Sequence, residues 1–94
     1  MVRLIARLKT KPGEEARVTE ALRRLAVPSL AEPGCVRYEP YVVKGDQATL
    51  VVIETWADQA AFDTHAASAP FQEFLATVGK ALDGPPDLAF LEEM

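Results

Sequence analysis

Along the chain, four short segments have strand character, the first of them by alternation of apolar and charged residues, and apolar residues recur at helical spacing in two other segments. Proline and glycine clusters separate these segments in the order strand, helix, strand, strand, broken helix, strand. This order is the split βαβ pattern, so the sequence predicts an α+β fold of the ferredoxin-like type. We expect a four-stranded antiparallel sheet with its helices on one face. No linker or repeat divides the chain, so residues 1–94 should form a single domain.

The first strand and helix follow from the N-terminal third of the sequence. Val2–Lys9 alternates in character as a strand does. Pro12 can stand at the start of the next helix, where its missing N–H costs nothing. Pro28 is expected to kink or end that helix, because its ring clashes with the preceding turn. The apolar stripe of this helix consists of Val18, Leu22 and Leu25.

A hairpin and a final strand supply the rest of the sheet. Strands are predicted over Cys35–Lys44 and Ala48–Trp56, joined by a turn at Gly45-Asp46. The last strand is Leu88–Leu91. Strict alternation would place Cys35 on the same face as Arg37 and Tyr41, opposite Tyr38.

The broken helix has its own start signals. Asp58 is a favourable N-cap for a short helix that should run through Ser68. Pro70 then starts another helix, whose apolar positions recur as far as Leu82. Gly84-Pro85-Pro86 stops this second part.

Three of the four strands are apolar on both faces. In the third strand, Leu50 and Val52 lie opposite Val51 and Ile53. Because the helices can cover only one face, a second apolar face needs a partner that shields it from water. A second copy related by a two-fold axis is the simplest one, so we expect a homodimer through the open sheet face. The alternative is that scattered apolar residues lie on a face exposed to water.

Composition excludes several classes of function. The net charge is −4, with 10 basic and 14 acidic residues and no basic patch, so we expect no nucleic-acid partner. The longest apolar run, Leu50–Ile53, cannot span a bilayer, so we expect no membrane contact and a cytoplasmic location. One Cys and one His cannot form an internal disulfide or an ordinary zinc site. We therefore expect no metal and no cofactor.

Five segments are distinctive along the chain, namely Lys11-Pro12-Gly13-Glu14, Glu32–Tyr38, Glu54–Asp58, Phe62 and His65–Phe71. In their order and spacing, they resemble the antibiotic biosynthesis monooxygenase family over essentially the whole chain. The resemblance implies a dimeric α+β barrel, in which two sheets pack face to face. It also implies an oxygenase that acts on phenols, quinols or anthrones without metal or flavin, although other members degrade heme or isomerise a small phosphorylated signal molecule.

The heme-degrading branch of the family fits less well. That branch carries an axial His on the helix where this chain has Phe71–Leu75, and an Asn on the first strand, where Val2–Lys9 has none. We therefore do not expect heme as a cofactor, although His65 could in principle supply a different ligand.

Three polar residues are candidates for catalysis. His65, the only His, matches a His that is common in the family, and it could act as general base or hydrogen-bond donor, or could instead bridge the helix break. Tyr38 could bind a phenol or quinone oxygen, or could be an ordinary strand tyrosine. Glu54 is in phase with apolar residues, so it could line a wet cavity near His65 and orient its ring, or could lie at the rim.

Three aromatic residues are candidates for substrate binding. Trp56, which the resemblance also picks out, could stack on a planar substrate or could fill the gap between sheet and helix. Phe71 and Phe62 would complete the walls. Cys35 has no basic neighbour in sequence, so we expect no nucleophile there.

The lead hypothesis is a monooxygenase of small aromatic compounds that uses no cofactor. A non-catalytic dimeric module that binds a small apolar molecule is the second hypothesis; it predicts that the polar candidates are dispersed over the surface. An isomerase of a small polar metabolite is the third, and it would need Arg7 or Arg37 inside the cavity. Arg37 could otherwise form an ion pair at the dimer interface.

Overall fold

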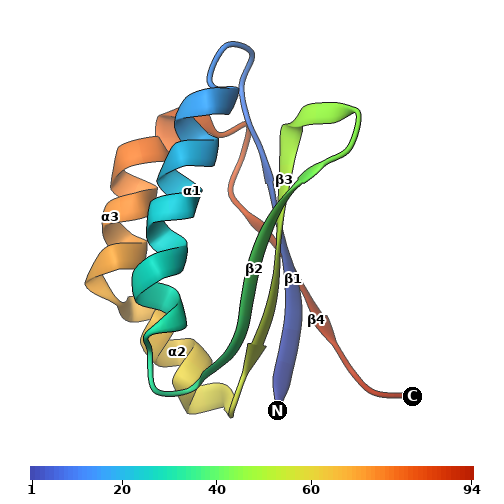
Figure 1. Cartoon of the computed structure of the whole chain (residues 1–94), viewed down its shortest axis with the longest axis vertical. Helices are drawn as coiled ribbons and strands as arrows, with labels where there is room; N and C mark the ends of the chain where they lie inside the picture. Colours follow the sequence, from blue (N-terminus) through green and yellow to red (C-terminus); the bar gives the residue numbers. More distant parts are fainter.

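A computed structural model describes residues 1–94 as one helical layer packed on one sheet (Figure 1). The elements are β1 (Val2–Lys9), α1 (Glu15–Leu30), β2 (Cys35–Val43), β3 (Asp46–Trp56), α2 (Gln59–Ala67), α3 (Ala69–Val78), a 3₁₀ turn η1 (Gly79–Ala81) and β4 (Asp87–Leu91). All neighbouring strands are antiparallel, in the order β2-β3-β1-β4. The predicted ferredoxin-like fold is confirmed.

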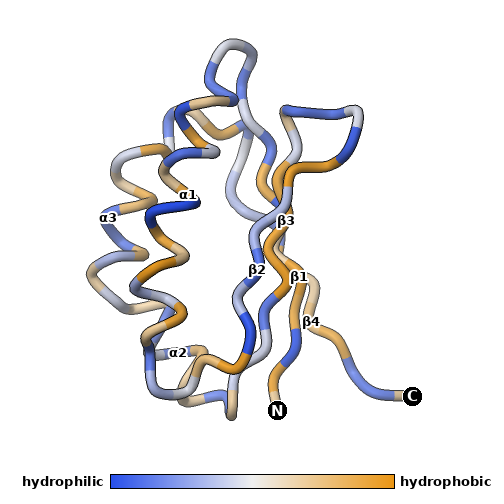
Figure 2. The backbone as a smooth tube through the Cα atoms, in the orientation of Figure 1, coloured by the Kyte–Doolittle hydropathy of each residue, from blue (hydrophilic) through white to orange (hydrophobic).

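The core lies between the helices and the sheet face that they cover. Alternate residues of β1 and β3 point into it, as the strand period of two requires, and the apolar colour in Figure 2 concentrates along these two strands. The stripe of α1 meets them from the other side. Burying one such side chain stabilises the fold by about 1.5–3 kcal/mol. The central members are Leu4, Leu8, Val18, Leu22, Leu50 and Val52.

Both ends of α1 differ from the prediction. Pro12 lies in a turn before the helix, which begins only at Glu15. Pro28 lies inside the helix, which continues to Leu30. The helix tolerates this proline because it falls in the last turn, where a single missing N–H leaves most of the hydrogen bonding intact. The next residue, Ser29, adds a hydrogen bond by donating its hydroxyl to the Leu25 carbonyl at 2.7 Å.

The break between α2 and α3 is confirmed, and it comes from two caps. Asp58 accepts a hydrogen bond from the Ala61 N–H at 2.8 Å and starts α2. Ser68 has extended backbone, and its hydroxyl caps α3. That helix ends at Val78, earlier than predicted, because Leu82 is extended and bridges to the residue after β1. None of the helices combines the length and the apolar character needed to cross a membrane.

The hairpin turn comes one residue earlier than predicted, at Lys44-Gly45. Gly45 has a φ of +86°, a left-handed conformation that glycine adopts at little cost. Asp46 therefore already belongs to β3. Its carboxylate accepts hydrogen bonds from the Ala48 N–H at 3.1 Å and the Thr49 hydroxyl at 2.7 Å.

Strand β2 departs from strict alternation at a bulge between Cys35 and Arg37. Cys35 and Tyr38 both pair with residues of β3 that face the helices, whereas Arg37 and Tyr41 point to the opposite face. The prediction that Cys35 shares a face with Arg37 and Tyr41 is therefore wrong. The cause is the extra residue of the bulge, which reverses the alternation locally.

No helix covers the other face of the sheet, here called the open face. Arg37 and Glu39 form an ion pair along β2 with an N–O distance of 2.8 Å, and Glu39 also accepts the Tyr41 hydroxyl. The Arg37 ion pair is thus made within the chain. Apolar side chains form a row across the centre of the face. In register across β3, β1 and β4, they are Ile53, Ile5 and Ala89.

Candidate functional site

A cavity of about 180 Å³ lies between the helices and the covered face of the sheet. Strands β1, β2 and β3 form one side, the three helices form the other, and Pro86 and Leu88 line the cavity at β4. Most of the lining is apolar. Five of the six residues singled out by sequence line this one cavity, and they are Tyr38, Glu54, His65, Phe62 and Phe71.

The polar residues of the cavity converge from both layers. Tyr38 and Glu54 are directly paired across β2 and β3, so their side chains emerge together on the covered face. His65 reaches the cavity from the last turn of α2. Their exposures are only 4%, 5% and 3% respectively. Polar groups buried to this degree are costly unless they are hydrogen-bonded, so each one requires a partner in the chain or in a ligand.

His65 is held by Glu32, which sequence reasoning did not select. Glu32 lies in the turn between α1 and β2, and its Oε2 is 2.8 Å from His65 Nδ1. A carboxylate accepts hydrogen bonds, so Nδ1 carries the hydrogen of this contact, and Nε2 is the ring nitrogen that Glu32 does not engage. The other carboxylate oxygen of Glu32 is buried and has no partner. The expectation that Glu54 orients the ring is therefore corrected, since Glu32 fills that role.

Glu54 has a partner of its own. Its Oε1 accepts a hydrogen bond from the Trp56 indole N–H at 2.9 Å. Burial raises the pKa of the Glu54 carboxyl above its ordinary value, while the Trp56 hydrogen bond and nearby His65 act in the opposite direction. Glu54 is thus a hydrogen-bond acceptor in the cavity that takes up a proton more readily than an exposed carboxylate.

Tyr38 is the tyrosine that faces the helices, while Tyr41 lies on the open face. Burial and the charge of Glu54 raise the pKa of the Tyr38 phenol, with a smaller opposing effect from the Ser29 hydroxyl. The phenol therefore stays protonated at neutral pH and can donate a hydrogen bond. Its ring meets the His65 ring edge to face, with a centroid distance of 5.5 Å.

Trp56 lies behind the cavity and outside its lining. The side chain is fully buried, and its ring packs on His65 with the centroids 4.6 Å apart and the planes tilted by 31°. This position corresponds to the gap-filling alternative for Trp56. The indole supports His65 by packing and Glu54 by hydrogen bonding, and it fixes the positions of both.

The aromatic walls lie nearer the surface. Phe71 packs on His65 with a centroid distance of 5.3 Å, and Phe62 makes an edge-to-face contact with Phe90 of β4 at the same distance. Leu88 of β4 also lines the cavity and is 44% exposed. The cavity therefore opens to solvent beside β4, with its polar groups at the buried end.

Several other candidates lie away from this cavity. Arg7 and Arg37 point to the open face, so no guanidinium enters. Burial raises the pKa of the Cys35 thiol, and the charges of Glu32 and Glu54 raise it further, which disfavours the thiolate. No three side chains of His, Cys, Asp or Glu lie close enough together to hold a metal ion.

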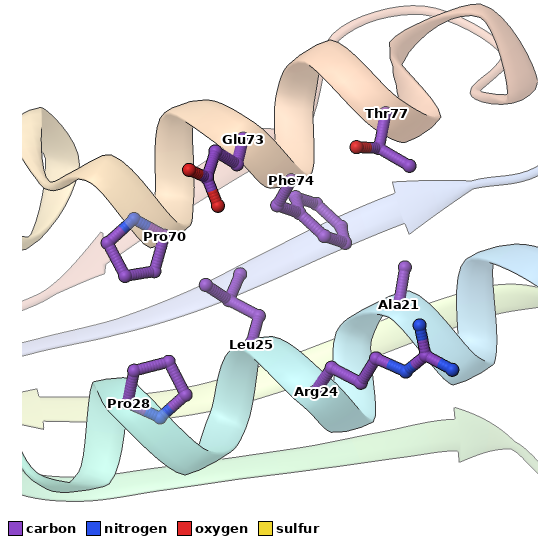
Figure 3. Close-up of a pocket in the computed structure, with 8 residues that line it drawn as sticks. All are labelled: Ala21, Arg24, Leu25, Pro28, Pro70, Glu73, Phe74 and Thr77. Atoms are coloured by element: carbon purple, nitrogen blue, oxygen red, sulfur yellow. The ribbon is translucent and has the colours of Figure 1, made fainter.

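A larger groove of about 400 Å³ runs between α1 and α3 (Figure 3). Leu25 and Phe74 line both this groove and the cavity, so they separate the two spaces. The groove offers little chemistry, because its charged residues are exposed. One of them, Arg24, is already paired with Glu20 at 3.4 Å.

Known proteins resemble this chain in sequence and in structure. The family model described as antibiotic biosynthesis monooxygenase matches residues 1–77. YcnE of Bacillus subtilis, which is named as a candidate monooxygenase, is 33% identical over 92 residues, covering 98% of this chain and 97% of YcnE. Rv0793 of Mycobacterium tuberculosis matches with a TM-score of 0.90 at 29% identity, covering 99% of this chain and 94% of that one. PA3566 of Pseudomonas aeruginosa gives 0.93 at 29% identity, with 99% and 93% covered.

Proposed function

Because this chain belongs to the antibiotic biosynthesis monooxygenase family, we propose that its cavity is the active site of a monooxygenase acting on a small aromatic hydroxyl compound. Phenols, quinols and anthrones form this substrate class, and the reaction uses no cofactor. One observation carries the proposal, namely the convergence of Tyr38, Glu54 and His65 in a single buried cavity. The binding-module hypothesis expects these groups to be dispersed over the surface.

Proton removal falls to His65. Its Nδ1–H is committed to Glu32, so Nε2 is the atom that accepts the substrate hydroxyl proton. The carboxylate of Glu32 then stabilises the imidazolium. Tyr38 donates a hydrogen bond to a substrate oxygen, and Glu54 accepts one from a second hydroxyl group. The low exposure of all three keeps bulk water away from the reacting anion.

The substrate itself supplies the electrons. For a hydroquinone, the ring anion adds dioxygen at carbon, and the imidazolium returns its proton to form a hydroperoxide. Loss of water breaks the O–O bond and converts that carbon to a carbonyl. The sum is hydroquinone plus dioxygen giving hydroxyquinone plus water, in which four electrons pass from the ring to oxygen. No separate reductant is consumed.

The isomerase hypothesis has less support. A phosphorylated or otherwise anionic metabolite would need cationic side chains around it. Arg7 and Arg37, the candidates for that role, extend from the open face of the sheet. The acidic Glu54 lines the cavity in their place.

Oxygen uptake tests the proposal. The purified protein is incubated with a panel of hydroquinones and anthrones in the presence of a chelator, and uptake is compared with the protein-free autoxidation rate. We expect uptake above that rate, and its loss in His65→Ala. A folded protein with no uptake across the panel would count against the proposal and favour a binding module.

We also propose that the chain works as a homodimer joined through the open face. The apolar row of Ile53, Ile5 and Ala89 supports this, because no helix covers it. Light scattering should give twice the mass of the chain. Ile5→Glu should shift the mass to that of a monomer, whereas the exposed, helix-side Glu20→Gln should not. A monomeric wild-type protein would refute this proposal.

A further inference from the structure

The size, charge and polarity of the cavity narrow the substrate class. We infer that the site accepts an uncharged compound with one aromatic ring and a free hydroxyl group, in preference to fused-ring or anionic compounds. This inference rests on the proposed function for the identity of the site, but its evidence is the shape and chemistry of the cavity.

Size limits the ligand to one ring. An engineered apolar cavity of about 150 Å³ holds benzene. The cavity here is about 180 Å³. The difference is close to the roughly 30 Å³ that a water molecule occupies in the liquid. That space admits small substituents on the ring, whereas a second fused ring would have to project through the open end beside β4. Pockets for drug-sized ligands are larger, at about 300–1,000 Å³.

Charge excludes an anionic head group. No Lys or Arg lines the cavity, while the Glu54 carboxyl does and the Glu32 carboxyl lies directly behind His65. A carboxylate or phosphate on the ligand would be buried beside like charges with no cation to pair with. A neutral hydroxyl group instead meets two acceptors, the Glu54 carboxyl and His65 Nε2.

The distribution of polarity sets the orientation of the ring. Tyr38, Glu54 and His65 lie at the buried end, whereas the exposed Leu88 marks the open end. The hydroxyl group therefore enters first, and the ring follows between apolar walls. Phe71 is the aromatic wall that packs on His65, so removing its ring would enlarge the cavity next to the polar groups.

Calorimetry in the absence of oxygen separates binding from turnover. Phenol, 2-naphthol and benzoate are titrated into the wild-type protein, and phenol should bind at least tenfold more tightly than either of the others. Phe71→Ala should improve 2-naphthol binding at least tenfold. Val78→Ala on the same helix, which is buried but outside the cavity lining, should leave the ratio of phenol to 2-naphthol affinity unchanged.

Each outcome has a distinct meaning. The inference is overturned if wild-type protein binds 2-naphthol or benzoate as tightly as phenol, or binds none of the three. The wild-type titrations decide this even if Phe71→Ala fails to fold. Selective phenol binding without oxygen uptake on hydroquinones would uphold the inference and overturn the monooxygenase proposal alone.

Discussion

Replacing Glu32 with Gln tests how His65 is activated. Glu32 Oε2 lies 2.8 Å from Nδ1 of an almost fully buried His65. Gln keeps an acceptor oxygen for the Nδ1–H but removes the charge that stabilises the imidazolium. Hydrogen bonds to charged groups contribute about 1.5–3 kcal/mol. If that contribution is lost in the transition state, kcat/KM falls roughly 10- to 150-fold, because about 1.36 kcal/mol corresponds to a factor of ten.

The assay is steady-state oxygen uptake on a hydroquinone that the wild-type protein turns over. Glu20→Gln, on the exposed surface of α1, is the matched control and should keep wild-type activity. Thermal unfolding checks that both variants are folded. A folded Glu32→Gln variant with activity within twofold of wild type would show that the Glu32 charge does not assist His65.

Three further variants test two cavity residues and the packing of the turn after α1 against α2. The pKa of the Glu54 carboxyl is raised in the folded chain, so the folded chain binds this proton more tightly than the unfolded chain does. The free energy of unfolding therefore falls as pH rises from the ordinary carboxyl pKa through the raised value. Glu54→Gln should remove this fall, so thermal midpoints of wild type and variant that stay parallel across this range would contradict the reasoning. Tyr38→Phe should lower kcat/KM about five- to tenfold through loss of one hydrogen bond, and Tyr41→Phe should not, so equal effects would argue against a cavity role. A Cβ on Gly34 would overlap α2, so Gly34→Ala should cost about 1–3 kcal/mol in unfolding free energy, whereas Gly79→Ala, which has open space, should cost little.

The fold was accessible from sequence because its signals are local. Turn residues bound the strands, and Asp58 and Pro70 mark the starts of the two parts of the broken helix. The cap at Ser68 became evident only in the structure. The errors occur where a local rule meets a tertiary constraint. Pro28 stays in α1 because it falls in the last turn, and Cys35 changes face because of a bulge that leaves no reliable mark in sequence.

The site was accessible only in part. Glu54 falls in phase with the apolar residues of its strand, which predicted that its side chain would face the core. His65 was selected because it is the only His in the chain. Glu32 was missed because it lies 33 residues before His65 and meets it only when the turn after α1 packs against α2. The one available signal was an acidic residue at the start of the Glu32-Pro33-Gly34 turn. Alternation also left open whether Tyr38 or Tyr41 faces the helices, and the register with β3 decides it.

Isotopic labelling of the product tests the monooxygenase assignment most directly. The reaction is run with a single-ring hydroquinone under ¹⁸O₂, and the hydroxyquinone is analysed by mass spectrometry at early times, before its oxygens exchange with water. We predict one labelled oxygen atom per product molecule at a rate that depends on His65. Unlabelled quinone formed together with an equal amount of hydrogen peroxide would contradict the account, because it would show that dioxygen only accepts electrons and is not inserted into the ring.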